Sequence, residues 1–278
     1  MVPSLPVPLV LSAYVPCCNN RSTVRAAVES LVRQTAPPDE ILVIDDGSTD
    51  DSVAQLAGLP VRVVRHARNL GRGAVRATAM REARGELVLS LDATNRLPED
   101  FVARARPWFD FPHTAAVFGP ICDPQPAGAV ARWRARHVFQ QGSVAPDPLP
   151  GALLATYGTV VRAAAVSRVG GYNPALRHSE DGELGRRLLA AGEGVIFVPE
   201  LTTFCNVRNS LSAVLERYAR WRAGAGEGSG LRTWWAGARY AWRAMLPQDL
   251  RAGDPAAAAI SLVAPFFHLW HNLGSLRR

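Results

Sequence analysis

Lysine is absent from this sequence, and all 31 of its basic side chains are arginines. A Walker-type phosphate loop, a Schiff base to a cofactor and a lysine general base each need a lysine. The absence therefore excludes pyridoxal-phosphate enzymes, P-loop nucleotide hydrolases and protein kinases.

Cysteine is scarce as well. The four cysteines form no CxxC pair and no cysteine–histidine spacing typical of a zinc site: Cys17, Cys18, Cys122 and Cys205. This argues against a zinc module and against a disulfide scaffold, since both need such clusters. The cysteine usage indicates a reducing compartment, and hence a cytoplasmic location.

Long apolar runs are also missing. The best candidate for a spanning helix, 256–270, is shorter than the ~18 apolar residues required, and Pro265 interrupts it. The first 15 residues are apolar, but prolines break them and no basic segment precedes them. We therefore expect neither a membrane span nor a signal peptide.

What the chain does have is length and an uneven distribution of charge. Its 278 residues suffice for one large domain, or for one domain with an appendage. The net charge is +7, and the segment after residue 199 holds 10 arginines but only five acidic residues. Five of the seven tryptophans lie in that segment too. The last quarter of the chain is therefore expected to present a different surface from the rest.

The first 200 residues alternate between short apolar runs and segments with helical spacing. Such runs are typical of strands buried on both faces of a parallel sheet, with helices between them. The pattern predicts an α/β, Rossmann-like fold with a mostly parallel central sheet and helices on both faces. The expected strands are 7–14, 41–44, 61–64, 87–91, 115–118, 159–161 and 195–198, and the expected helices are 23–32, 51–59, 73–84, 98–108 and 181–191.

Three carboxylates directly follow expected strands. Asp45 and Asp46 end the run 41–44, and Asp92 ends the run 87–91. Parallel α/β sheets bind ligands at the carboxyl ends of their strands, so these side chains are expected at a ligand-binding edge. The alternative for the first two is a glycine turn after which Ser48 or Thr49 caps the next helix, and for Asp92 it is a cap on the following turn. Two adjacent buried like charges are costly, however, unless a polar ligand such as a base or ribose occupies them.

Two further segments carry groups suited to phosphate and proton chemistry. The segment 69–71 opens an expected helix that contains Arg76, and a helix N-terminus with an arginine in its first turns favours anions. Glu180, Asp181 and Glu183 cluster at the start of another helix. They either complement the helix dipole or supply a general base.

The order of these motifs along the chain resembles that of the family 2 glycosyltransferases, which have the GT-A fold. The resemblance covers about residues 7–220 and rests on five segments in register: Val15-Pro16-Cys17-Cys18-Asn19, Glu29–Thr35, Glu40–Asp50, Asn69–Glu86, and Gly170-Gly171-Tyr172 with Glu180-Asp181. It implies a GT-A domain over 1–209, with a nucleotide-sugar-binding half at 1–119 and an acceptor half at 120–209. A C-terminal helical extension would then occupy 210–278.

On the donor side, the resemblance assigns roles by position. Pro16, Cys18 and Asp46 would line the pocket for the nucleotide base, with Cys18 where the family usually has tyrosine. Arg76 would lie near the nucleotide or its diphosphate. Asp92 takes the first position of the family's DxD motif and would hold Mn²⁺ or Mg²⁺.

On the acceptor side, Asp181 would be the catalytic base that deprotonates an acceptor hydroxyl, with Glu180 in support. The resemblance implies a bacterial enzyme that moves a sugar from a nucleotide-sugar donor to an acceptor with inversion at the anomeric carbon. The metal and the arginines would stabilise the departing nucleoside diphosphate. The motifs do not distinguish a glycan, a lipid-linked molecule or a small molecule as acceptor.

One position departs from the family pattern. The third DxD position is Thr94, a neutral and poor metal ligand, and the neighbouring Asn95 is neutral too. Three interpretations follow: metal binding through Asp92 and water, charge compensation by arginines with little metal, or a catalytically degenerate protein that keeps nucleotide-sugar or partner binding. The presence of Asp181 favours an enzyme.

The segment 217–221 loosely resembles one that some family members use near the acceptor and the diphosphate. It implies that Arg220 pairs with the diphosphate and that Trp221 stacks on a sugar ring. The alternative is a helix that packs Trp221 into a core. The glycine-rich run 224–230 is either a mobile lid or a linker.

Helices are expected at 211–223, 231–246 and 256–273, and the last two combine apolar residues with tryptophan and arginine. Such helices can lie in a membrane interface, which would suit a lipid-linked acceptor at the inner face of a membrane. Packing on the GT-A domain or on a second copy is the alternative. The basic excess is modest and accompanies no recognition motif, so we expect no nucleic-acid partner.

Overall fold

The structure, a computed structural model, describes the backbone of four stretches: 9–143, 146–205, 207–223 and 231–275. Side chains are described in these stretches except at 220–223, 231–233 and 268–275. The chain forms two compact units. The first comprises 1–121 with 145–207, and the second comprises 122–144 with 208–278.

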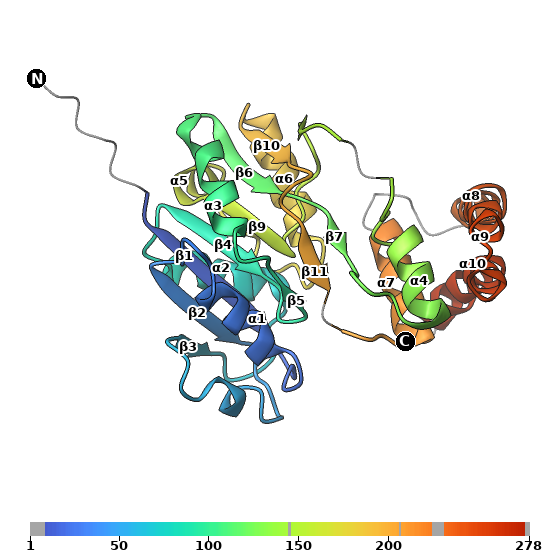
Figure 1. The fold of residues 1–278 in the computed structure, drawn as a ribbon, viewed down its shortest axis with the longest axis horizontal. Coiled ribbons are helices and arrows are strands. Elements are labelled where there is room, and N and C mark those ends of the chain that lie inside the picture. Colours follow the sequence, from blue (N-terminus) through green and yellow to red (C-terminus); the bar gives the residue numbers. More distant parts are fainter. Residues whose placement is uncertain (1–8, 144–145, 206, 224–230, 276–278) are drawn as a thin grey trace, which may run out of the picture. The chain divides into compact units, whose positions relative to one another are not determined.

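The first unit is built on an eight-stranded sheet with the order β3-β2-β1-β4-β9-β6-β10-β8 (Figure 1). Strands β3, β2, β1 and β4 are parallel to one another, and β10 is parallel to β6. Strand β9 runs antiparallel between β4 and β6, and β8 runs antiparallel to β10. The mostly parallel α/β sheet expected from the sequence is confirmed. The strands are β1 (Leu11–Cys17), β2 (Glu40–Asp45), β3 (Arg62–Arg65), β4 (Leu87–Leu91), β6 (Thr114–Phe118), β8 (Leu149–Pro150), β9 (Gly158–Arg162) and β10 (Gly194–Phe197).

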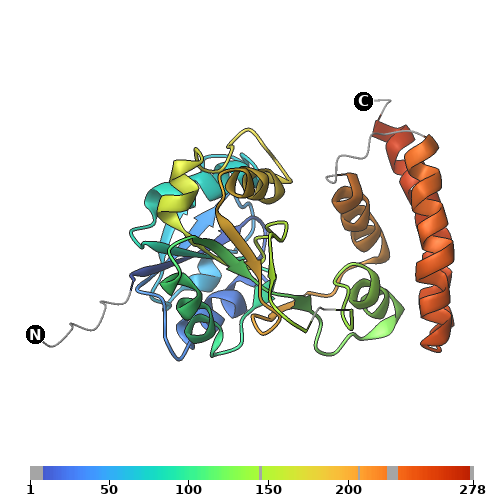
Figure 2. The ribbon, with the colours of Figure 1, turned by 90° about the horizontal axis from the view of Figure 1, so that it is seen from above.

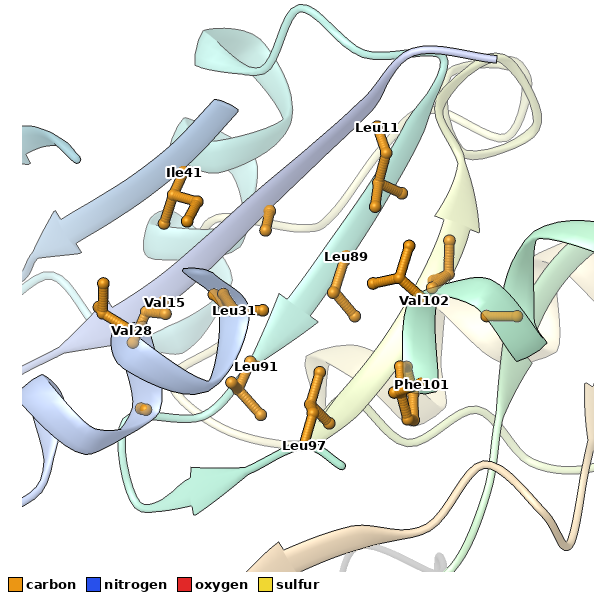
Figure 3. Close-up of a cluster of buried hydrophobic side chains, with 14 of the residues drawn as sticks. Leu11, Val15, Val28, Leu31, Ile41, Leu89, Leu91, Leu97, Phe101 and Val102 are labelled. Atoms are coloured by element: carbon orange, nitrogen blue, oxygen red, sulfur yellow. The ribbon is translucent and has the colours of Figure 1, made fainter. Parts of the chain in front are cut away.

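Helices cover both faces of this sheet. On one face, α1 (Val24–Val32) and α3 (Phe101–Ala105) pack their apolar side chains onto the strands, as Figure 3 shows for Leu31 and Phe101 beside Leu89. The other face is covered by α2 (Arg72–Glu82), α5 (Ala163–Arg168) and α6 (Glu180–Ala190). Successive strand residues point to opposite faces, which explains the continuous apolar runs in the sequence. Each fully buried leucine contributes about 1.5–3 kcal/mol to this core.

Two expected helices are shorter than their sequence pattern. In place of 51–59 there is a single 3₁₀ turn, Ala54–Leu56. Asp50 accepts hydrogen bonds from the backbone N–H and the hydroxyl of Ser52, and such local bonds compete with helix formation. In place of 98–108, α3 ends at Ala105 and a 3₁₀ segment, Arg106–Asp110, follows, because Pro107 has no N–H to continue the helix.

A small second sheet contains β5 (Asn95–Arg96), β11 (Thr203–Cys205) and β7 (Ile121–Cys122). Strands β5 and β11 are antiparallel, with Phe204 opposite Arg96. Strand β5 begins three residues after Asp92, so this pairing fixes the segment that follows the end of β4.

The second unit is helical. Its elements are α4 (Gly128–His137), α7 (Leu211–Ala223), α8 (Leu231–Tyr240), a π-helical turn (Ala241–Met245), α9 (Leu246–Arg251) and α10 (Pro255–Ser275). Figure 2 shows α8, the π-helical turn and α9 as one continuous rod. Pro247 lies just after the π-helical turn and lacks the N–H that would bond to the preceding helical turn, which accounts for the local widening. None of the described helices is long and apolar enough to cross a membrane.

Helix α4 belongs to this second unit, whereas the sequence placed 120–209 in the acceptor half. The reason lies in its side chains. Trp133 is fully buried and donates an indole N–H to Ser261 Oγ of α10 at 2.8 Å. Arg132 makes a bidentate pair with Asp254, with N–O distances of 2.6 and 2.9 Å. Segment 122–144 therefore packs with the C-terminal helices.

Candidate active site

The carboxyl ends of β1, β2 and β4 meet at one edge of the sheet. Cys17, the last residue of β1, lies opposite Asp45, the last residue of β2. Asp45 and Asp46 are buried, and Asp45 accepts a hydrogen bond from the Ser48 N–H at 3.1 Å. Asp92 immediately follows β4. The fold thus brings the three expected strand-end carboxylates to the edge where parallel α/β sheets bind ligands.

The Asp46 carboxylate holds the loop that opens α2. Its oxygens accept hydrogen bonds from the backbone N–H groups of Leu70 and Gly71, each at 2.9 Å, and one oxygen lies 2.8 Å from His66 Nδ1. Gly71 has φ 96°, a conformation that L side chains rarely adopt, and an added Cβ would lie 3.1 Å from Arg177. In this structure Asp46 therefore positions the loop of residues 69–71, and its contact with a base stays a prediction.

The exit of β1 is tied to both neighbouring loops. Asn19, with φ 55°, accepts a hydrogen bond from the Thr49 N–H at 2.9 Å through its side chain. The Asn69 amide lies 3.2 Å from Cys18 Sγ. Pro16 and Cys18, expected to line the base pocket, are both half-buried. These bonds give the β1, β2 and α2 loops one fixed arrangement.

Arg76 of α2 is the hub of the site, and its side chain is only 2% exposed. Its Nε donates to Glu180 Oε1 at 2.7 Å. One terminal nitrogen donates to Tyr14 Oη at 3.0 Å and to Ser90 Oγ at 2.7 Å, and the other lies 3.5 Å from Asp92 Oδ1. Glu180, Tyr14, Ser90 and Asp92 thus surround the guanidinium.

Burial opposes the charge of Arg76, but its electronegative neighbours more than offset that cost, so the pKa of Arg76 is raised well above its usual value. Glu180 is buried with it and neutralises its charge. The side chain of Asp92 is 24% exposed, so its negative charge is the one that the network presents at the surface. The arrangement favours a cation or a cationic complex at Asp92.

The residues around Asp92 fit a divalent cation only in part. Thr94 is neutral, and the Asn95 amide donates to the Tyr157 carbonyl at 2.9 Å. Within the described residues, no group of three histidine, cysteine or acidic side chains could hold a metal ion. Mg²⁺ is commonly held by one or two carboxylates together with substrate phosphates. The single carboxylate of Asp92 fits a cation that takes its remaining ligands from a diphosphate and water.

Asp181 lies in the first turn of α6, beside the buried Glu180. It is half-buried, and its oxygens accept hydrogen bonds from the Thr156 hydroxyl at 3.2 Å and from the Gly182 N–H at 2.8 Å. The Thr156 carbonyl in turn accepts from Ser90 Oγ at 3.1 Å, which connects Asp181 to the Arg76 hub. Asp181 combines a fixed position with partial access to solvent, as a general base requires.

Four polar residues at this site were not predicted as site residues from the sequence: Tyr14, Ser90, Thr156 and Tyr172. Burial raises the pKa of Tyr172, and the nearby Tyr14, Asp181 and Glu180 raise it further. The available signal was a polar side chain within an otherwise apolar strand, as at Tyr14 and Ser90. That signal is weak, because only the fold shows that both strands place their polar groups on Arg76.

Arg220 and Trp221 lie on α7, but their side chains are outside the described residues. The same holds for the glycine-rich run 224–230. Their expected roles in diphosphate and sugar binding, and the choice between lid and linker, therefore stay predictions.

The fold is of the GT-A type, with carboxylates at the ends of its parallel strands. The model of glycosyl transferase family 2 matches residues 12–162, which is more than half of the chain. The chain belongs to this family. The resemblance found in the sequence is thereby confirmed.

Relatives in sequence agree with this assignment. A glycosyltransferase of Haemophilus influenzae is 34% identical over 84 residues, which are 30% of this chain and 29% of the relative. The pre-mycofactocin glycosyltransferase of Mycobacterium tuberculosis is 27% identical over 219 residues, 71% of this chain and 43% of the relative. The matches thus span less than half the length of these relatives.

Solved structures confirm the fold. A mannosyltransferase of Pyrobaculum calidifontis, in complex with GDP-mannose and Mn²⁺, has a TM-score of 0.63 at 18% identity, covering 96% of this chain and 88% of the other. Staphylococcus aureus TarS residues 1–349, in complex with UDP-GlcNAc, has a TM-score of 0.54 at 18% identity, covering 77% and 66% of the two chains. Structures of this fold therefore hold nucleotide-sugars, in one case together with a divalent metal.

Proposed function

We propose that the chain transfers a sugar from a nucleotide-sugar donor to an acceptor hydroxyl, with inversion at the anomeric carbon and with Asp181 as the general base. The observation that supports this most is the connection between the two expected halves of the site. Arg76 contacts both Asp92 and Glu180, the residue before Asp181. A single buried cation thus fixes a donor-side and an acceptor-side carboxylate relative to each other.

On the donor side, the N–H groups of Leu70 and Gly71 are taken by the Asp46 carboxylate, so we assign the diphosphate to a cation at Asp92 and not to these amides. Asp92 would hold a Mn²⁺ or Mg²⁺ ion that arrives with the donor. Such an ion, when bound, neutralises charge that develops on the departing diphosphate. The alternative is that arginines compensate the charge of the diphosphate with little metal. Donor binding that does not depend on metal would indicate this alternative in the experiments below.

Arg76 acts in this proposal as a positioning residue, because its buried guanidinium is occupied by protein groups. Its 2.7 Å bond to Glu180 anchors the first turn of α6 and with it Asp181. On the acceptor side, Asp181 takes a proton from the attacking hydroxyl while Thr156 orients its carboxylate. Inversion follows because the hydroxyl attacks the face opposite the leaving diphosphate.

We further propose that the nucleotide-sugar-binding half of the site lies in 1–119, with Pro16, Cys18 and Asp46 around the base. The reducing, cytoplasmic location indicated by the cysteines stays part of this proposal. So do the pairing of Arg220 with the diphosphate and the stacking of Trp221 on a sugar ring.

The test measures donor binding and release of the nucleotide (a diphosphate, or CMP from the CMP-sugars) over a set of UDP-, GDP-, dTDP- and CMP-sugars. Asp181→Asn should bind the donor as the wild type does but release its product about 10²–10⁴-fold more slowly, the usual contribution of a general base. Asp110→Asn, at an exposed acidic residue of the same unit, is the matched control and should behave as the wild type.

Two outcomes contradict the proposal. Equal turnover in Asp181→Asn would remove the general-base role. Donor binding without turnover in the wild type, for every donor, would favour the alternative of a catalytically degenerate nucleotide-sugar-binding protein.

A further inference from the structure

The second unit exposes an aromatic surface that the transfer reaction does not use. Trp235 and Trp242 on the α8 rod and Phe266 on α10 form a chain of ring contacts, with centroid distances of 6.5 Å for Trp235–Trp242 and 6.1 Å for Trp242–Phe266. Trp235 is 58% exposed and Phe266 is 51% exposed, and the neighbouring Leu262 is exposed too. We call Trp235, Arg239, Trp242, Arg243, Leu262 and Phe266 the tryptophan face.

The rings of this face are held in fixed positions. Trp242 donates its indole N–H to the Leu262 carbonyl at 3.2 Å. Trp234, which packs against both Trp235 and Phe266, donates to the Pro265 carbonyl at 2.9 Å. Because the polar N–H groups of Trp234 and Trp242 are bonded within the unit, these two indoles contribute apolar ring surface.

The charge around the face has one sign. Residues 231–248 include three arginines and no acidic residue, and α10 has no charged residue along its 21 residues. Arg239 and Arg243 are exposed one helical turn apart and line a depression of about 460 Å³ together with Trp235, Ala236 and Trp242. Within the described residues, neither arginine has an ion-pair partner. The occupant of this face must therefore carry negative charge beside apolar groups.

We propose that the tryptophan face docks onto an anionic lipid bilayer. Arginines among tryptophans are suited to the headgroup level, where guanidinium groups pair with phosphates and indoles sit between water and acyl chains. Leu262 and Phe266 would reach the acyl boundary. A second copy of the face would bring arginines against arginines, and a nucleic acid would leave the aliphatic surface of Leu262 uncovered. The helices lie on the membrane in this account and do not cross it.

The size of the effect follows from the composition of the face. Each arginine near an anionic surface strengthens binding roughly fivefold. The double substitution Arg239→Gln with Arg243→Gln should therefore weaken binding to anionic vesicles by about 25-fold. Adding Trp235→Ala to this double substitution removes one exposed indole from the headgroup level. Binding to anionic vesicles should then weaken further.

The experiment is co-sedimentation of the full chain with two kinds of vesicle: phosphatidylcholine alone, and phosphatidylcholine mixed with phosphatidylglycerol. The expected result is binding to the mixed vesicles that falls with salt and with each substitution on the face. Matched controls in the first unit are Arg81→Gln and Phe111→Ala, at exposed residues of the same kinds, and they should bind as the wild type does. Thermal melts identify any variant that has lost its fold.

Three results would overturn the proposal: no binding of the wild type to anionic vesicles, equal binding to both kinds of vesicle, or anionic binding that survives the double arginine substitution in a folded variant. Concentration-dependent dimerisation or oligonucleotide binding that the same substitutions abolish, without vesicle binding, would assign the face to those occupants instead. Asp181→Asn should bind vesicles as the wild type does, so the result does not depend on the transfer reaction.

Discussion

Both units bury an arginine–carboxylate network, but only the network of the first unit exposes a carboxylate. In the first unit, Arg76 joins Glu180 to Asp92, whose side chain is 24% exposed. In the second unit, Asp249 is 0% exposed and accepts hydrogen bonds from Arg136, from His137 Nε2 at 2.8 Å and from Ser261 Oγ at 2.6 Å. The same kinds of group thus form a candidate reaction site in the first unit. In the second unit they form a buried link between helices α4, α9 and α10, which we call the helix clamp.

The difference shows what separates a functional charge network from a structural one. Removing one partner from a buried pair costs stability in either case, because the remaining charge is left uncompensated. Chemistry additionally requires a charged oxygen that solvent or substrate can approach. Asp92 and Asp181 satisfy this condition, whereas Asp249 is enclosed by α4 and α10.

The largest effect is expected for Arg76→Met. The substitution leaves Glu180 buried without a counter-charge, which should cost about 3–5 kcal/mol of unfolding free energy. Product release by the remaining folded molecules should fall as well, because Asp181 loses its anchor. Denaturant titration and donor turnover measure the two effects. Arg76→Lys separates position from charge: a reduced kcat at an unchanged donor KM supports a positioning role, and a raised KM alone contradicts it.

Asp249→Ala should destabilise the second unit by a similar or smaller amount, about 3 kcal/mol, because Arg136 then keeps only its longer pair with Asp254, at 3.6 Å. Turnover per folded molecule should stay unchanged, since the clamp presents no group to a substrate. Circular dichroism melts and donor turnover check this pair of expectations. A variant that stays fully folded yet loses turnover would contradict the assignment of a purely structural role to the second network.

Thr94→Asp adds a second carboxylate near Asp92 and should therefore strengthen metal binding at the site. We expect the metal concentration that gives half-maximal activity to fall about tenfold, as for a ligand or supporting group added to a metal site. Metal titration of donor turnover measures it, with Thr94→Asn as the neutral control. No change in the aspartate variant would indicate that Asp92 does not hold the cation.

The smallest effect concerns pH. Burial lowers the pKa of His137 below its usual value of 6.5, and Arg136 lowers it further, while the hydrogen bond to Asp249 acts in the opposite direction. The unfolded chain therefore takes up a proton near pH 6.5 that the folded chain resists, so stability should fall as the pH drops from 7 towards 5. His137→Gln should flatten this part of the stability profile. Denaturation midpoints at the two pH values provide the measurement, and an unchanged slope would contradict the assignment.

Much of the first unit was predictable because buried parallel strands leave continuous apolar runs. Strand β4 matches its expected range, and the carboxylates after β2 and β4 were expected at one edge on that basis alone. The 3₁₀ turn at Ala54–Leu56 was not predictable in this way, because side-chain bonds from Asp50 and Ser52 replaced the helix that the spacing indicated.

The residues of the site likewise divide into those that the sequence predicts and those that only the fold reveals. Asp92 and Asp181 could be proposed from their motifs, but the buried position of Arg76 could not, because it depends on four elements that meet only in the fold. The assignment of 122–144 to the helical unit likewise depends on Trp133 and Arg132, whose partners lie more than 100 residues away in the chain. Contacts of such long range leave no local pattern in the sequence.

The central claim is that Asp92 presents the charge that receives a metal-bound nucleotide-sugar. Its most direct test is the thermal stability of the wild type and of Asp92→Asn with each donor, in the presence of Mn²⁺, Mg²⁺ or EDTA. A ligand at about 100 times its Kd stabilises its protein by about 2.7 kcal/mol. We predict a shift of this order with one nucleotide class and metal, which EDTA reduces and Asp92→Asn abolishes. An equal shift in EDTA and in Asp92→Asn, or no shift with any donor, would contradict the claim.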